Sequence, residues 1–143
     1  MLYGAMTHPL LLRAIGAAGH GAKILIADSN YPHATYANPR SEVIYLNLAP
    51  GLINATDVLE VIKATVPIEA AEIMVPAPDA GPVDIAIHDE YRAALPGLPI
   101  TEVSRWDYYA SAGADNVAVV IATGEARIYA NLLLTIGVRQ PGE

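Results

Sequence analysis

The 143 residues suffice for one compact domain, 1–143, and their net charge of −7 includes only eight Lys and Arg, too few for a basic stripe along nucleic acid. The absence of cysteine and of clustered histidines disfavours disulfides, thiolate zinc sites and metal catalysis. Apolar runs fall far short of the roughly 20 residues that span a bilayer. We therefore expect a cytoplasmic protein without membrane or nucleic-acid partners.

Helix and strand signals alternate along the chain. Thr7 is the predicted cap of a first helix with Pro9 in its opening turn, and Gly19 is its predicted end. The apolar face of this helix comprises Leu10, Leu11, Ala14, Ile15 and Ala18. The run 23–28 predicts a buried strand that ends in Asp28, at the kind of sheet edge where open α/β sheets bind ligands.

The rest of the chain continues this alternation. Further strands are predicted at 42–48, 71–75, 100–105, 117–122 and 128–136. Further helices are predicted from Asn54 to about Val66, at 84–95 with Ile85, Ile87, Tyr91 and Leu95 facing inward, and at 106–112. The pattern indicates an α/β fold, a single domain with a mixed, largely parallel sheet flanked by helices.

Two glycines flank His20 between the first helix and the first strand. They let the backbone turn sharply, and the helix C-terminus favours protonated imidazole by about 0.3–1 kcal/mol. Because the reference pKa of His is about 6.5, His20 is suited to proton transfer near neutrality. The alternative is a capping loop whose His bonds the last helix carbonyls.

Asp28 opens the segment Asp-Ser-Asn-Tyr-Pro at the end of the first strand. Its carboxylate could accept hydrogen bonds from two sugar hydroxyls, or it could orient and charge-stabilise the imidazole of His20. The alternative is an Asx turn that begins the next loop.

A third motif runs from Thr123 to the end of the chain's last strand. If the strand is extended, Tyr129 and Asn131 point to the same face, where an aromatic ring and an amide suit a pyranose. The alternative places both on the exposed side of an edge strand. An aromatic cluster, Arg105-Trp-Asp-Tyr-Tyr109, precedes this motif, and packing at a helix entrance is its simpler interpretation.

Taken in order, these motifs resemble the ribose pyranase/fucose mutarotase family, and the fucose mutarotase branch most. The resemblance covers nearly the whole chain. It implies that His20 is the acid/base and that Asp28, Tyr109, Tyr129 and Asn131 contact or act on a sugar. Two departures are Ala22-Lys23 after the His motif, where the family has Asp, and Glu69, where the family tends to carry Asp after the second helix.

The resemblance therefore implies a mutarotase that needs no metal or organic cofactor. His20 and Tyr109 are the expected catalytic pair, and Asp28, Glu69, Arg105, Tyr129 and Asn131 are the expected substrate-binding residues. Pyranose/furanose interconversion and non-catalytic sugar binding are the alternatives.

Self-association is also expected. Hydrophobic residues make up 53% of the chain and charged residues 16%, a thin polar surface for a monomer, although a well-buried α/β domain reaches the same balance. The family resemblance implies a homo-oligomeric ring, a pentamer or decamer, with sites at subunit contacts.

Overall fold

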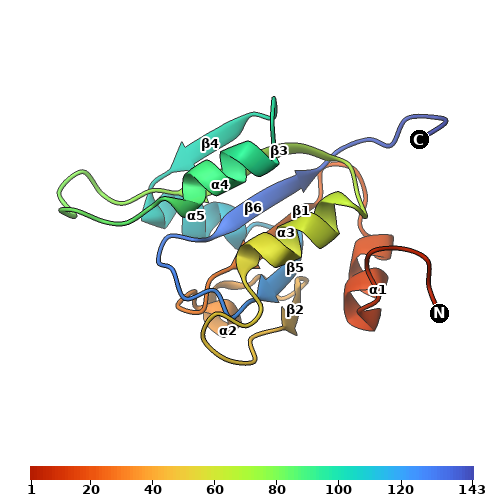
Figure 1. Ribbon diagram of the computed structural model, residues 1–143, viewed down its shortest axis with the longest axis horizontal. Helices are drawn as coiled ribbons and strands as arrows, with labels where there is room; N and C mark the ends of the chain where they lie inside the picture. The colour runs from red at the N-terminus through yellow and green to blue at the C-terminus, as the bar shows by residue number, and fades with distance from the viewer.

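A six-stranded sheet in the order β2-β5-β1-β6-β3-β4 forms the centre of the molecule (Figure 1). The structure is a computed structural model that describes residues 1–143. The strands are β1 (Lys23–Ala27), β2 (Glu42–Tyr45), β3 (Ile68–Met74), β4 (Ile100–Val103), β5 (Val117–Ala122) and β6 (Leu132–Ile136). The helices are α1 (Pro9–Ala17), α2 (His33–Tyr36), α3 (Ala55–Lys63), α4 (Ile87–Ala94) and α5 (Arg105–Ala112).

One strand runs against all the others. β6 pairs antiparallel with both β1 and β3, whereas β1 with β5, β2 with β5 and β3 with β4 are parallel. The predicted mixed, largely parallel sheet is therefore confirmed. Because β6 is reversed, its first residues lie at the edge where the other strands end, and Leu132 pairs with Ile26 near the end of β1.

Alternate residues of β1 pack against different helices. Ile24 and Ile26 belong to the core beneath α1, α3 and α4, whereas Leu25 and Ala27 belong to the core beneath α5. All four are fully buried. Both faces of the central strand are thus covered, which explains why its sequence is a continuous apolar run.

The predicted elements are all present with differences at their ends, and the short helix α2 is an additional element that the sequence patterns did not indicate. α1 is capped by His8 and not by Thr7, because the His8 Nδ1 accepts the Leu11 backbone N–H at 3.3 Å. Ile85 lies outside α4 and is exposed, so its predicted inward position is wrong. The last strand begins at Leu132, and Tyr129 lies before it with a φ of 55°.

No helix is long and apolar enough to cross a membrane.

Gly124 packs directly against the backbone of the segment 49–53, which follows β2. Its N–H donates to the Ile53 carbonyl at 2.9 Å, and its carbonyl accepts the Gly51 N–H at 2.6 Å. A Cβ on Gly124 would collide with the carbonyl oxygens of Leu52 and Ala49. The glycine of the Thr-Gly-Glu motif therefore allows the backbone of the β5–β6 connection to pack closely against residues 49–53.

Gly124→Ala should lower the free energy of unfolding by about 1–3 kcal/mol, because rigid backbone and not a mobile side chain must move. Urea denaturation measures it. Gly16→Ala is the matched control, since Gly16 lies inside α1 with open space around its Cβ position. The control should be neutral or stabilising by up to about 1 kcal/mol. Equal effects of the two changes would contradict the packing role of Gly124.

Candidate functional site

Asp28 is a buried carboxylate that joins the end of β1 to the start of β6. It is 3% exposed. One carboxylate oxygen accepts the Asn30 N–H at 3.0 Å, and the other accepts the Ala130 N–H at 3.2 Å and the Asn131 side-chain amide at 2.9 Å. The Asn131 Oδ1 in turn accepts the Asp28 N–H at 2.9 Å. Burial raises the pKa of the carboxyl group, and hydrogen bonds from Asn30, Ala130, Tyr31 and Asn131 oppose that shift.

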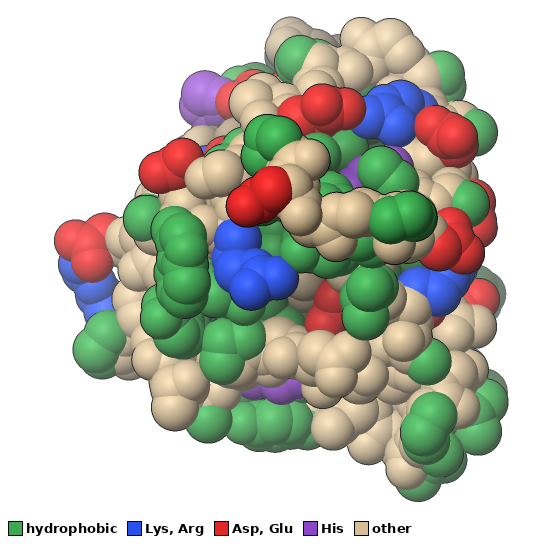
Figure 2. Space-filling view, turned by 90° about the vertical axis from the view of Figure 1, so that its left-hand side faces the viewer, with side chains coloured by type: hydrophobic (Ala, Val, Ile, Leu, Met, Phe, Trp, Pro, Cys, Tyr) green, Lys and Arg blue, Asp and Glu red, His purple; other side chains and the backbone are tan.

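A cavity of about 370 Å³ opens beside this carboxylate at the edge where the parallel strands end. It is lined by Asp28, Asn30, Tyr31, Met74, Arg105, Tyr109, Ile128, Tyr129 and Asn131. Five of the predicted site residues are therefore brought together here. Figure 2 views the molecule from the side to which the loop between β3 and α4 projects, and shows apolar and charged side chains intermingled.

Tyr129 reaches the cavity through an unusual backbone conformation. Its φ of 55° is left-handed, and no other residue except glycine has a positive φ. The predicted extended conformation is therefore wrong, yet Tyr129 and Asn131 both line the cavity. The Tyr129 hydroxyl accepts a hydrogen bond from Arg105 at 2.8 Å. A strained residue of this kind costs roughly 1–3 kcal/mol and persists only where its surroundings hold it.

The surroundings that hold this segment include two residues that the sequence motifs missed. His88 Nε2 lies 2.8 Å from the Tyr129 carbonyl, and the Tyr91 hydroxyl donates to the Ala130 carbonyl at 2.6 Å. Sequence reasoning placed Tyr91 in the core but gave no signal for its hydroxyl. A histidine on an apolar helix face is the signal that could have indicated His88.

Tyr109 carries the phenol that α5 presents to the cavity. Its ring packs edge-on against Tyr31 at 5.4 Å and Trp106 at 5.7 Å between centroids. Burial raises the pKa of the Tyr109 hydroxyl, which Arg105 partly offsets. At neutral pH this phenol is therefore a proton donor, the form that an acid needs.

His20 lies outside this cavity. Its Nε2 is 3.1 and 3.2 Å from the two carboxylate oxygens of Glu69, and both side chains are largely exposed. A separate hollow surrounds it, with Arg40 and Asn116 on its wall. The acidic partner of His20 within the subunit is thus Glu69, and not Asp28.

β1 separates the two groups of site residues. His20 precedes the five residues of this strand and Asp28 follows them. At about 3.3 Å per residue, the first and last residues of this strand lie roughly 13 Å apart. The chain therefore presents the cavity at one end of the strand and an exposed His–Glu pair at the other.

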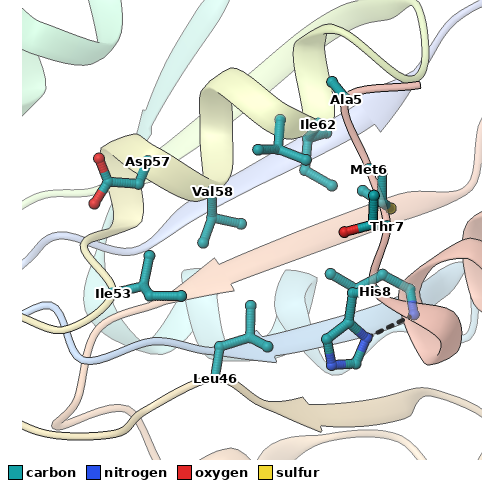
Figure 3. Close-up of a pocket in the computed structure, with 11 residues that line it drawn as sticks. Ala5, Met6, Thr7, His8, Leu46, Ile53, Asp57, Val58 and Ile62 are labelled. Carbon is teal, nitrogen blue, oxygen red and sulfur yellow. Dashed lines mark hydrogen bonds between the residues drawn. The ribbon is translucent and has the colours of Figure 1, made fainter. Parts of the chain in front are cut away.

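A second cavity, of about 340 Å³, lies among α1, α3 and the segment after β2 (Figure 3). Its lining is mostly apolar, and two of its polar side chains, His8 and Asp57, already have local partners. His8 accepts the Leu11 N–H, and Asp57 accepts the Asn54 N–H at 3.1 Å. Because few polar groups remain to pair with hydroxyls, this cavity suits a sugar less well than the one beside Asp28.

No group of three or more His, Asp or Glu side chains is arranged to hold a metal ion.

Comparisons with known proteins establish the family. Residues 1–139 match the RbsD / FucU transport protein family, and the chain belongs to that family. It is 36% identical over 136 residues to a D-ribose pyranase of Laribacter hongkongensis (strain HLHK9), covering 94% of this chain and 95% of that protein.

Solved structures agree with the fold. The fucose mutarotase in complex with L-fucose from Streptococcus pneumoniae is 30% identical, with a TM-score of 0.79 over 93% of this chain and 94% of that one. Bacillus subtilis RbsD complexed with D-ribose is 23% identical, with a TM-score of 0.83 over 98% and 100%, and at that identity it shows the fold alone. The family expected from the sequence is confirmed, whereas its fucose branch stays a prediction.

Asp28→Asn should destabilise the protein, because an amide N–H would face the donors from Ala130 and Asn131 or from Asn30. An unpaired buried donor costs about 1–3 kcal/mol. Chemical denaturation measures the loss. Asp89→Asn is the control, since that carboxylate is 87% exposed and pairs only with Arg92. It should change stability by less than about 0.5 kcal/mol. A neutral Asp28→Asn would show that the donors rearrange freely.

His33 should make stability depend on pH. Its Nε2 lies 3.0 Å from the Asp28 carbonyl, and burial lowers its pKa below 6.5. As the pH falls from about 7 to 5, the unfolded chain takes up this proton before the folded chain does, so stability falls. His33→Gln keeps a hydrogen-bond donor but cannot titrate. In this variant the urea midpoint of unfolding should depend less steeply on pH over this range. An unchanged slope would contradict the assignment.

Proposed function

We propose that the protein is a cofactor-independent sugar mutarotase that interconverts the α and β anomers of a reducing monosaccharide, L-fucose or a similar sugar. The observation that carries the proposal is the cavity that gathers Asp28, Asn131, Tyr129, Arg105 and Tyr109. Its volume of about 370 Å³ is within the range typical of small-molecule sites. The relative complexed with L-fucose supports the choice of sugar.

The cavity residues are suited to hold a pyranose. Asp28 accepts hydrogen bonds, and each carboxylate oxygen can accept more than one. Arg105 donates to the Tyr129 hydroxyl, which leaves the Tyr129 O–H proton free for a sugar oxygen. The faces of the aromatic rings can cover the apolar face of the sugar.

Mutarotation requires one proton to leave the anomeric hydroxyl and one to reach the ring oxygen. The ring then opens to the aldehyde, the carbonyl face turns, and the ring recloses. We assign the base to His20, which Glu69 orients, and the acid to Tyr109, whose phenol keeps its proton at neutral pH. On reclosure the two transfers run in reverse.

This mechanism requires two subunits. Because His20 and the cavity lie at opposite ends of β1 in one chain, His20 of one subunit must reach the cavity of its neighbour. A contact between unlike surfaces generates a ring when the rotation closes. We propose a pentameric or decameric ring, consistent with the large exposed side chains of Tyr3, Leu48 and Trp106.

Pyranose/furanose interconversion is the second candidate. The 36% identity to a D-ribose pyranase favours it. The same proton transfers open either sugar, so the two functions differ in the sugar that fits and the ring that recloses. Saturation-transfer NMR on L-fucose and D-ribose distinguishes them by the pairs of signals that exchange.

His20→Gln should slow anomer exchange by about 10²–10⁴-fold while leaving the fold and assembly intact, because proton transfer of this kind contributes that much. Saturation-transfer NMR measures the exchange. His8→Gln is the matched control and should retain full exchange, since His8 is a helix cap remote from the cavity. Near wild-type exchange by His20→Gln would remove His20 from the mechanism.

Subunits that carry His20→Ala and Asn131→Ala should restore partial activity when co-expressed, although each variant alone is inactive. A mixed ring contains sites whose His20 and Asn131 are both intact. Differently tagged chains allow the hybrid to be purified, and light scattering gives its mass. A fully active monomer of single-chain mass would overturn the two-subunit site.

A further inference from the structure

One peptide unit in the cavity wall is held at both ends. The bond between Tyr129 and Ala130 offers its carbonyl to His88 at 2.8 Å and its N–H to the Asp28 carboxylate at 3.2 Å. Rotation of this peptide would break both hydrogen bonds together. This peptide directly follows Tyr129, whose φ is left-handed, and directly precedes the Ala130–Asn131 peptide, and both Tyr129 and Asn131 line the cavity.

The next peptide unit is held from the same helix. The Tyr91 hydroxyl donates to the Ala130 carbonyl at 2.6 Å. His88 and Tyr91 are three residues apart in α4, so they lie on one face of the helix, toward this segment. Figure 1 shows α4 over the sheet on the same side as α3.

We propose that His88 and Tyr91 are positioning residues that hold Tyr129 and Asn131 in the conformation that binds the sugar. This inference rests on the proposed function of the cavity. Neither residue lines the cavity, so both act through the backbone that they hold. We name the pair the α4 clamp.

Burial makes the α4 clamp selective for one backbone conformation. His88 is 1% exposed and Tyr91 is fully buried. A carbonyl can only accept, so His88 must carry its proton on Nε2. Because water cannot replace either donor, loss of one leaves a buried carbonyl unpaired and favours another orientation of its peptide.

His88→Leu removes the donor and keeps an apolar side chain, whereas His88→Gln keeps a donor at a similar reach. We expect His88→Leu to weaken sugar binding and slow anomer exchange by about tenfold each, the equivalent of one lost hydrogen bond. His88→Gln should recover most of both. Tyr91→Phe should weaken binding in the same direction while preserving the packing of its ring.

Leu95→Ala is the stability control, because Leu95 caps the same helix and is 3% exposed in the core, and its apolar side chain offers no hydrogen bond to the Tyr129–Asn131 segment. It should lower the unfolding midpoint and leave sugar affinity unchanged. If Leu95→Ala lost as much sugar affinity as His88→Leu, general destabilisation of α4 would explain both losses. That result would overturn the proposal.

A double-mutant cycle tests whether His88 acts through Tyr129. If it does, His88→Leu should weaken binding much less in a Tyr129→Phe background, where the contact to Arg105 is already lost. Fully additive effects would overturn the proposal.

Hydrogen exchange separates this inference from the proposed function. The Ala130 amide should exchange faster in His88→Leu than in wild type or Leu95→Ala, whether or not any sugar binds. Unchanged protection of that amide would refute the clamp. A wild-type protein that neither binds nor interconverts any sugar would refute the proposed function and leave the exchange result to decide the clamp.

Discussion

The carboxylate of Asp28 lies where the end of β1 meets the start of β6, and the cavity is built around it. A desolvated carboxylate is unfavourable unless donors surround it. The Ala130 N–H, the Asn131 amide and the Asn30 N–H meet that requirement, and in doing so they join two segments of backbone, 28–30 and 130–131. The same group that stabilises the wall of the cavity is thereby available to a ligand within it.

The reversed direction of β6 makes this contact possible. If β6 ran parallel to β1, its first residues would lie at the opposite edge of the sheet, beside Gly21 and not beside Asp28. Because it runs antiparallel, Asn131 lies next to the end of β1 without a long connection. The β5–β6 connection is also anchored, since the Thr123 hydroxyl donates to the Ala27 carbonyl at 2.7 Å and buried Glu125 pairs with Arg127 at 2.9 Å.

The length of β1 has a consequence for assembly. A straight strand cannot bring its two ends together, so within one chain the His20–Glu69 pair lies away from the cavity. Assembly resolves this if each subunit supplies its exposed imidazole to a neighbour. In the proposed ring, side chains that are exposed in the single chain would become contacts, in line with the thin polar surface expected from the composition.

The sequence by itself determined the fold class, the approximate place of all strands, and five of the nine residues that line the cavity. These follow from local patterns: the apolar run of β1 ends at Asp28, and Tyr129 and Asn131 stand near the last strand. Tertiary structure decided which of them meet. His88 contacts the carbonyl of the left-handed Tyr129, 41 residues away, and His20 contacts Glu69, 49 residues away. Local propensity carries no information about such contacts, because they arise only when packing brings distant backbone together.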